Sequence, residues 1–451
     1  MHEGMIHRLI GVFDQAFSQL DVRVGPDRLE DLAVLIHKAM TVQARNYHNL
    51  EHVFSFVDPQ NPIQTLAALF HDIVYYQVDL GFLPEIRRII SPYVHEKDGV
   101  ISLAQQIPDT DRLFWQALDI FGLRDRVVIT PGMGVNEFLS AVVMNRKMDR
   151  ILQERDLLKM MLCIEATIPF RGPSPSGESH FEILARRARL VSETWGLEVG
   201  EEELDQAVMV AVRFANKDVE GFAEEDPGKF LEGTWKLLPE MNIPLRSRDV
   251  YSIREYRRAI QSMEASLGAL DPNNVFHNYR GVPPQAEFER MVGRAQENIQ
   301  TARAYLRIKL LAQAILEALA LETGGDAPLS LFMGDLPHAF ESVQRLEDFL
   351  PDLPVPDWVD RSSTLYLLLD SGRKGDVSFD LTTAPLSLFV YKSLPLADLD
   401  RSLLLAQEMF AGRLSPHDFL LQIDRKLVGA IARASAGMVL TRSAQLKKYS
   451  F

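Results

Sequence analysis

The stretch from Tyr47 to Tyr75 decides the fold that we expect for this chain. It contains two short motifs, Tyr47-His48-Asn49-Leu50-Glu51-His52-Val53 and Leu69-Phe70-His71-Asp72-Ile73-Val74-Tyr75. Between them, Asp58-Pro59-Gln60-Asn61-Pro62 is a strong helix breaker, because proline cannot continue a helix and the other residues favour turns. We therefore predict one helix over 47–57 and a second, buried helix over 63–76, packed against each other as a hairpin.

Three histidines and one aspartate come together on this predicted hairpin. His48 and His52 lie four residues apart, so on a helix their side chains share one face. His52 stands about 9 Å of helix before the break and His71 about 14 Å after it, which places the two imidazoles at similar heights. Asp72 adds a carboxylate within an apolar run, where an unpaired charge would be costly to bury. Nitrogen and oxygen donors in one place predict a transition-metal site rather than a calcium site, although an isolated HxxxH pair is more often an ordinary surface or core pair.

The order of these motifs resembles the HD-domain superfamily of metal-dependent phosphohydrolases. YHNxxHV followed by FHD is similar to the two opening motifs of its small predicted phosphohydrolases, and YHNxxH is also similar to the opening motif of the cyclic-nucleotide phosphodiesterases. Three later segments extend the resemblance to NExxSA, IxATxxH and a final metal-binding aspartate: Asn136-Glu137-Phe138-Leu139-Ser140-Ala141, Ile164-Glu165-Ala166-Thr167 and Phe214-Ala215-Asn216-Lys217-Asp218-Val219. Together the matches span roughly residues 30 to 225, about half of the chain.

The resemblance implies a mainly α-helical, HD-domain-like bundle that binds a divalent metal ion. His52, His71, Asp72 and Asp218 would be the metal ligands, and the ion would be Mn, Fe, Zn, Co, Ni or Mg. In the phosphodiesterase-like interpretation, His48 is not a ligand but the catalytic proton donor to the leaving group, a role for which an imidazole is well suited. For the last ligand, other acids nearby in the sequence are alternatives: Asp205, Glu220 and Asp226.

Asn136, Glu137 and Arg171 are further candidates for the site. Glu137 is a candidate catalytic residue, and Asn136 a candidate substrate contact, where both could instead orient a ligand or a water molecule. The alternative for this pair is an ordinary helix N-cap with an acid in the first turn. Arg171 lies in the Pro- and Gly-rich segment 170–177, which could be a lid whose arginine binds a phosphate, or simply a solvated connector.

The sequence also departs from the family pattern. An insertion-like stretch separates Tyr76 from Asn136, and the polar residue and histidine expected after Thr167 are missing. These departures affect the expected substrate contacts more than the metal ligands. No motif surrounds His95 or His180, and the setting of His277 is typical of a capped turn, so none of these three is a predicted ligand.

Composition limits the possible partners and the location. The 48 Lys and Arg against 62 Asp and Glu give a net charge of -14, which argues against duplex nucleic acid as the main partner. Cys163 is the only cysteine, which excludes an internal disulfide and favours the cytoplasm. We expect no signal peptide and no membrane partner, because no stretch approaches the roughly 20 apolar residues that span a bilayer. A homo-oligomer is compatible with the sequence.

Breaks in the helical patterns predict three parts. We expect an HD-like metal-binding helical domain over 1–230, a helical extension packed on it over 231–326, and a smaller, mainly helical accessory domain over 327–451. Within them, 285–322 is a long helix or a pair, while the leucine-rich 364–369 and 386–391 are either short strands or buried helices. Ten segments of the first half have a helical pattern: 5–20, 27–40, 47–57, 63–76, 83–92, 111–120, 136–150, 154–166, 179–195 and 202–215.

The function that we expect is hydrolysis of a phosphate ester by metal-activated water. The substrate would be a small phosphorylated molecule, with a nucleotide as the first choice. Two alternatives remain: a non-catalytic HD-type metal-binding sensory or interaction module, and an interaction protein in which the histidines are structural.

Overall fold

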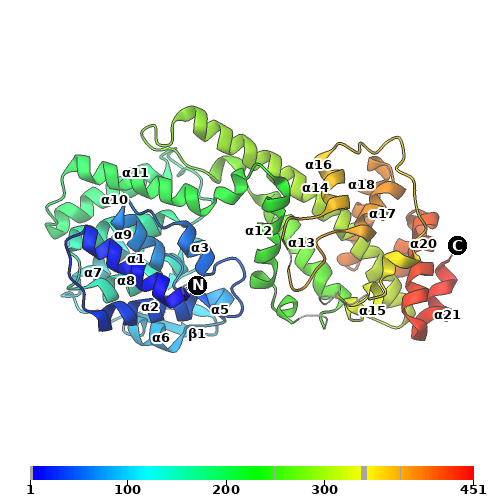
Figure 1. Cartoon of the computed structure of the whole chain (residues 1–451), viewed down its shortest axis with the longest axis horizontal. Coiled ribbons are helices and arrows are strands. Elements are labelled where there is room, and N and C mark those ends of the chain that lie inside the picture. The colour runs from blue at the N-terminus through cyan, green and yellow to red at the C-terminus, as the bar shows by residue number, and fades with distance from the viewer. Residues whose placement is uncertain (1–3, 248–249, 337–342, 376, 451) are drawn as a thin grey trace. The chain divides into compact units, whose positions relative to one another are not determined.

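The computed structural model describes residues 4–247, 250–336, 343–375 and 377–450. Within these ranges the chain is mainly α-helical, which confirms the predicted fold class (Figure 1). The chain divides into two compact units, Met1–Ala223 with Asp271–Gly293, and Glu224–Leu270 with Arg294–Phe451. This division differs from the three predicted parts, because most of the segment 231–326 belongs with the C-terminal residues.

The first unit holds the predicted site. Its elements are α1 (Met5–Gln19), α2 (Pro26–Met40), α3 (Leu50–Ser55), α4 (Pro62–Phe70), α5 (Tyr76–Asp79), α6 (Pro84–Ile90), β1 (Val94–Lys97), β2 (Val100–Leu103), α7 (Arg112–Phe121), β3 (Val128–Ile129), α8 (Val135–Met148), α9 (Glu154–Ala166), α10 (His180–Trp195) and α11 (Glu201–Asp218). Each of the ten segments with a helical pattern overlaps one of these helices. The antiparallel sheet β1-β2-β3, which lies in the insertion-like stretch, was not predicted.

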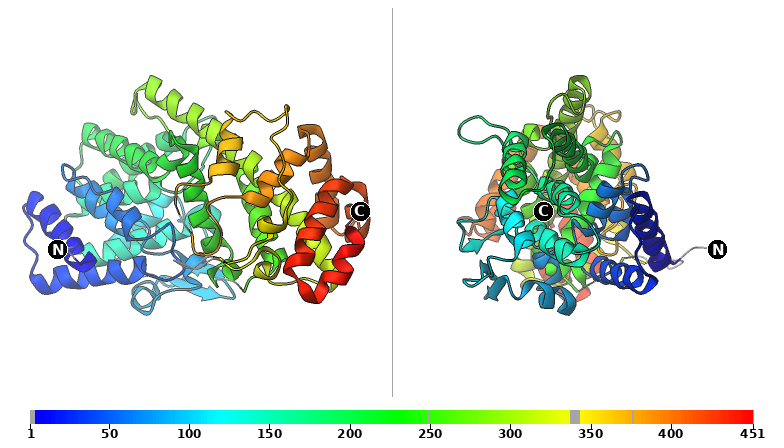
Figure 2. Two further views of the ribbon diagram at one scale, coloured as in Figure 1. Left: turned by 45° about the vertical axis from the view of Figure 1, so that its right-hand side comes forward. Right: turned by 90° about the vertical axis from the view of Figure 1, so that its left-hand side faces the viewer.

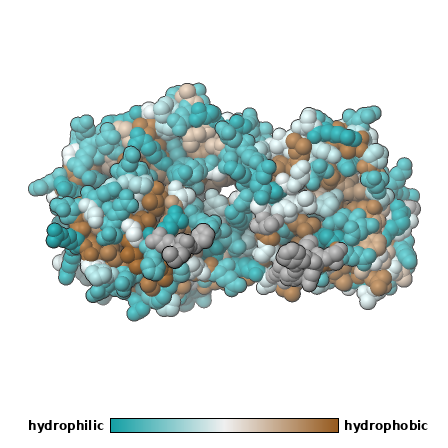
Figure 3. All heavy atoms as spheres, in the orientation of Figure 1, coloured by the Kyte–Doolittle hydropathy of each residue, from teal (hydrophilic) through white to brown (hydrophobic). Residues whose placement is uncertain are grey.

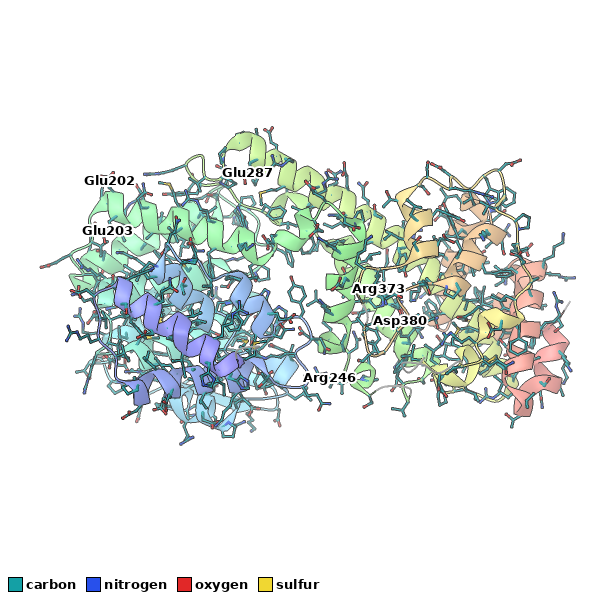
Figure 4. All side chains as sticks on the ribbon, in the orientation of Figure 1. Glu202, Glu203, Arg246, Glu287, Arg373 and Asp380 are labelled. Atoms are coloured by element: carbon teal, nitrogen blue, oxygen red, sulfur yellow. The ribbon has the colours of Figure 1, made fainter. Side chains whose placement is uncertain are left out.

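Helix α9 forms the centre of this unit. It packs against α4, α7, α8, α10 and α11, and from Met160 to Ile164 every side chain is buried. The two N-terminal helices α1 and α2 pack on each other, and Figure 2 shows them side by side in dark blue. At the start of α11 the acidic first turn, where Figure 4 labels Glu202 and Glu203, stabilises the positive end of the helix dipole. That helix ends at Asp218, the predicted fourth ligand.

Helices α3 and α4 are shorter than predicted. The Asn49 side chain accepts hydrogen bonds from the backbone N–H groups of Glu51 and His52, so it caps α3 and leaves His48 outside the helix. Helix α4 begins with Pro62 after the Asn61 cap, and it ends at Phe70. The predicted helices over 47–57 and 63–76 were therefore too long at the ends that carry His48 and His71.

The second unit is built around one long helix. Its helices are α12 (Pro227–Met241), α13 (Ile253–Ala269), α14 (Gln285–Thr323), α15 (Leu329–Met333), α16 (Thr364–Ser371), α17 (Pro385–Ser393), α18 (Leu396–Phe410), α19 (Pro416–Gln422), α20 (Arg425–Met438) and α21 (Ser443–Leu446), with the first turns of α14 assigned to the first unit. From Ile308 to Ala320, every residue of α14 is buried, so this stretch packs on all sides. This packing explains why α14 belongs with the C-terminal residues. The two leucine-rich segments are helices α16 and α17, not strands, and each begins with a strong start signal: a Ser363 cap and Pro385.

A buried carboxylate ties the second unit together. Asp380 Oδ2 accepts hydrogen bonds from Trp235 Nε1 and from the Tyr256 hydroxyl, each at 2.8 Å. The same oxygen lies 3.0 Å from Lys309 Nζ and 3.5 Å from Arg373 Nη1, and Figure 4 shows Arg373 and Asp380 next to each other. Burial acts to raise the pKa of Asp380, but the charges of Lys309 and Arg373 outweigh it and hold the pKa below its usual value. This cluster joins α12, α13 and α14 to the segment that follows α16.

Polar side chains cover most of the visible surface of each unit, with apolar patches between them (Figure 3). None of the helices in the described ranges combines the length and the apolar character that a membrane crossing requires.

We predict that Asp380→Ala lowers the free energy of unfolding of the second unit by about 3 kcal/mol, because it leaves two buried cations without a counter-charge. Urea denaturation followed by circular dichroism and tryptophan fluorescence measures the loss. Asp400→Ala is the matched control, since Asp400 makes an ion pair with Arg307 at the surface and its removal should cost less than about 1 kcal/mol. Equal losses in the two variants would contradict the structural role of Asp380.

Candidate metal centre

Three predicted ligands from three elements meet in the first unit. His52 lies on α3, His71 follows the last residue of α4, and Asp218 is the last residue of α11. Their potential ligand atoms all lie within 4.8 Å of one another. The two imidazole Nε2 atoms are 3.4 Å apart, and His52 Nε2 is 3.3 Å from Asp218 Oδ1. Two neutral imidazoles and a carboxylate are a common donor set for a divalent transition-metal ion.

Asp72 completes the predicted set. Its Oδ2 atom lies 3.1 Å from His71 Nε2 and 3.4 Å from His52 Nε2. This oxygen is shielded from solvent, yet it has no hydrogen-bond partner among the described residues. Asp72 stands outside the three-residue group whose atoms all lie within 4.8 Å of one another. The imidazoles of His52 and His71 face this buried oxygen closely, and a bound cation would give it a further partner.

The side chains of His52, His71 and Asp72 shift one another's pKa values strongly. Burial acts to lower the pKa of His52, but the carboxylates of Asp218 and Asp72 outweigh it and raise that pKa to about 10. The pKa of His71 is also raised, chiefly by Asp72 and against the effect of burial. Burial acts to raise the pKa of Asp72, whereas the two imidazoles hold it well below its usual value. The carboxylates thus attract positive charge into this site, and a divalent ion can supply it in place of two protons.

The ring of His71 is held in one orientation. Its Nδ1 atom lies 2.7 Å from the Ala68 carbonyl oxygen, so Nδ1–H donates there and Nε2 faces His52 and Asp72. The ring packs against Phe56 at 4.9 Å and Phe214 at 5.7 Å between centroids, and it is fully buried. A ligand that is oriented in this way loses little conformational freedom when it binds an ion.

Arg45, which the sequence analysis did not single out, holds the turn that carries Asp72. Its Nη1 atom donates to the Asp72 carbonyl oxygen at 2.6 Å, while Nε and Nη2 donate to the two carboxylate oxygens of Asp79 at 2.9 and 2.7 Å. The Arg45 side chain is completely buried. An arginine two residues before the YHNxxHV motif was the available signal, but its distant partners could not be identified from spacing.

The NExxSA segment lies against the same turn. The Ser140 hydroxyl oxygen accepts from the Val74 backbone N–H at 3.1 Å, and Asn136 Oδ1 accepts from the Tyr76 N–H at the same distance. Asn136 Nδ2 donates to Gln77 Oε1 at 2.9 Å. Asn136 is therefore committed to protein contacts, and it is not the N-cap of α8, because Gly134 occupies that position.

His48 and Glu137 lie near the ligand group, which is formed by His52, His71 and Asp218. The ring centroid of His48 is 5.5 Å from that of His52 and 4.8 Å from that of Tyr75. His48 reaches this position from the bend before α3, so the prediction that it shares a helix face with His52 was wrong. Glu137 Oε2 is shielded and has no hydrogen-bond partner among the described residues. Burial, with added effects from Asp72 and Asp218, raises the pKa of Glu137 to about 7.

Arg171 is bound to the protein rather than held out on a lid. Its Nη1 donates to Glu165 Oε1 at 2.8 Å, and its Nε donates to the Ile168 carbonyl oxygen at 3.1 Å. Glu165 is fully buried, and its other oxygen lies 3.0 Å from His180 Nε2. No sequence motif indicated this contact between His180 and the segment Ile164–Thr167. His277 lies in the same region, with its ring 5.1 Å from that of Phe181.

The alternatives to Asp218 are engaged elsewhere. Asp205 accepts from Arg189 and from the Tyr279 hydroxyl, Glu220 accepts from Lys217, and Asp226 caps α12. Of the four acids, only Asp218 belongs to the group of described residues that could hold a metal ion.

Comparisons with known proteins do not show which family this chain belongs to. No protein-family model matches the chain, no curated protein matches it, and no solved structure matches it.

We predict that the purified chain binds one divalent transition-metal ion through His52, His71 and Asp218. His71→Ala and Asp218→Asn should each weaken binding at least about 100-fold, because loss of a mere supporting partner of a ligand already costs about 10- to 100-fold. Isothermal titration calorimetry with Mn, Co or Zn measures the affinity. The control is His95→Ala, which removes an exposed imidazole on β1 and should leave the affinity unchanged. Binding that survives in both ligand variants would refute the site.

We predict that the titration of His277 contributes to acid destabilisation. Burial, helped by His180 and Arg171, lowers its pKa to about 4 from a usual value of 6.5. Between these values the unfolded chain binds a proton that the folded chain does not, so stability falls as the pH is lowered. The contribution should be about 2 kcal/mol between pH 7 and pH 5.

Unfolding free energies of the wild type and of His277→Gln, measured across this range, isolate the effect because every other titrating group is common to both. The difference between them should shrink, or change sign, as the pH falls. The His95→Gln control should show no such trend. A difference that is constant with pH would contradict the assignment.

Proposed function

We propose that this chain is a metal-dependent phosphohydrolase that acts on a small phosphorylated molecule, with a nucleotide as the first candidate. The observation that carries the proposal is the convergence of His52, His71 and Asp218 within 4.8 Å, with the Asp72 carboxylate beside both imidazoles. The resemblance of the surrounding motifs to the HD-domain superfamily supports the same activity.

The residues present suit a divalent ion of the Mn, Fe, Zn, Co, Ni or Mg group. When bound, such an ion supplies a Lewis acid that activates water and offsets negative charge on phosphoryl oxygens. The protein supplies the geometry, because His71 is fixed through Ala68 and the Asp72 turn is fixed through Arg45.

His48 and Glu137 have complementary roles in the proposed reaction. His48 stands beside the ligand group without belonging to it, and from there its imidazole donates a proton to the leaving oxygen. Glu137, whose pKa of about 7 keeps it near half-ionised at neutral pH, receives a proton from the attacking water at its free Oε2 atom. One group thus donates a proton and the other accepts one in the same proposed reaction.

A second function, a metal-binding sensory or interaction module without turnover, is favoured by one observation. Both residues that were predicted to contact the substrate are already paired, Arg171 with Glu165 and Asn136 with Tyr76 and Gln77. A module that binds an ion but turns over no substrate needs neither of them.

Hydrolysis assays separate the two functions. The full chain is incubated with a panel of nucleotides and phosphomonoesters in the presence of Mn, Mg or Co, and released phosphate is measured. We expect hydrolysis that disappears in His71→Ala and Asp72→Ala, and that falls about 10²- to 10⁴-fold in His48→Gln while metal affinity is retained. His95→Gln is the matched control for His48→Gln. Stoichiometric metal without any turnover across the panel would overturn the enzyme proposal in favour of the non-catalytic module.

A further inference from the structure

A hollow in the first unit is lined by an unusual number of positive side chains. It lies between the end of α7, the turn before α8, the end of α9 and the first half of α10, and it holds about 590 Å³ of space with its open mouth included. The lining residues that matter here are Met133, Ile168, Arg126, Arg171, Arg187 and His180. No aspartate or glutamate is among its described lining residues.

The charges around this hollow do not cancel. Glu165, behind the lining, is the carboxylate that pairs with Arg171 at 2.8 Å, and it lies 3.6 Å from Arg187. His180 adds no charge, because burial lowers the pKa of its imidazole and the neutral ring donates from Nε2 to Glu165. Among the lining residues and Glu165, three guanidinium groups therefore face one carboxylate, in a chain whose net charge is -14.

The protein holds the Arg187 side chain through one of its nitrogen atoms and leaves other N–H groups available. Its Nη1 donates to the Ile120 carbonyl oxygen at 3.2 Å. The guanidinium lies against Gly122, where an added Cβ would stand 2.5 Å from Arg187 Cζ, and Gly122 has a φ of +65°. Only a residue without a side chain leaves this room. Among the described residues, Nη2 and Nε of Arg187 have no hydrogen-bond partner, and the Arg126 side chain has none either.

The hollow adjoins the turn that carries Glu137. Gly134 separates the two, since an added Cβ there would stand 2.5 Å from Ile168 Cγ1 and 3.4 Å from Glu137 Oε2. Arg171 acts on both sides, because it lines the hollow and its charge also acts to lower the pKa of Glu137. The hollow is nonetheless built from residues that are distinct from the four predicted metal ligands.

We propose that this hollow is a binding site for a phosphate group, either free or carried by a small molecule, and that Arg187 and Arg126 bind its oxygens. Planar guanidinium groups match the geometry of phosphate oxygens and form two parallel hydrogen bonds to them. Arg171, bound to Glu165, supplies charge from one wall. The proposal goes beyond the metal centre and does not depend on hydrolysis there.

Phosphate binding to the full chain tests the proposal. Inorganic phosphate is titrated by calorimetry in the presence of a chelator, so that no bound metal contributes. We expect one saturable site, weakened at least about tenfold by Arg187→Gln and by Arg126→Gln, since each removes a charge-assisted hydrogen bond. Arg126 is exposed and without a described partner, so its variant keeps the test valid even if Arg187→Gln is destabilised.

Arg186→Gln is the matched control. Arg186 is the neighbour of Arg187 on α10 and makes a surface ion pair with Glu178, so its loss changes the net charge equally but leaves the hollow intact. The absence of saturable binding, or an equal loss in Arg186→Gln, would overturn the proposal.

A second titration identifies the source of the phosphate. Adenosine 5′-monophosphate that binds at least about tenfold more tightly than inorganic phosphate, and is weakened by Arg187→Gln, indicates a phosphate carried by a larger molecule. Equal affinities that are equally sensitive to the substitution indicate free phosphate. If neither compound binds, the hollow is only a solvated basic pocket, and the proposal is wrong.

Discussion

The candidate metal centre depends on the way in which helix α4 is stopped. After Phe70 the backbone groups that would have continued the helix are bound by side chains from elsewhere: Ser140 accepts from the Val74 N–H and Asn136 from the Tyr76 N–H. Arg45 donates to the Asp72 carbonyl oxygen. Because buried backbone groups must be paired, these three contacts replace the lost helical hydrogen bonds. They fix the turn that carries Asp72 beside the imidazoles of His52 and His71.

A second constraint is that carboxylates buried in this acidic protein need positively charged or hydrogen-bonding neighbours. Three buried carboxylates among the described residues have neighbours that oppose the cost of burial: imidazoles at Asp72, Arg171 and His180 at Glu165, and Lys309 and Arg373 at Asp380. The three sites differ in balance. Asp380 and its two cations form a structural tie, whereas Asp72 retains an oxygen without a hydrogen bond, and the hollow near Glu165 has excess positive charge. Imbalance of this kind marks places where a ligand lowers the free energy.

The sequence predicted the helices well where the pattern was local. Apolar spacing and breakers placed helices within ten segments of the first half, and the Asp58–Pro62 breaker separated α3 from α4 as expected. The pattern did not indicate the sheet in the insertion-like stretch. It placed His48 on a helix, whereas the Asn49 side chain caps α3 and leaves His48 outside. The expected three parts also differ from the two units, since the packing of α14 on all sides depends on residues far away in the sequence.

For the site, the sequence by itself determined the candidate ligands, because two histidines and two aspartates stand in recognisable motifs within apolar surroundings. The tertiary structure decided which of them meet. Asp218 lies with the two histidines, whereas Asp205, Glu220 and Asp226 do not. Asn136 and Arg171 are bound to other protein groups. Three residues near the site or the hollow had no sequence motif: Arg45, His180 and Arg187. The reason is physical: spacing along a helix fixes neighbours within one or two turns, whereas contacts between residues tens of positions apart follow only from how the helices pack.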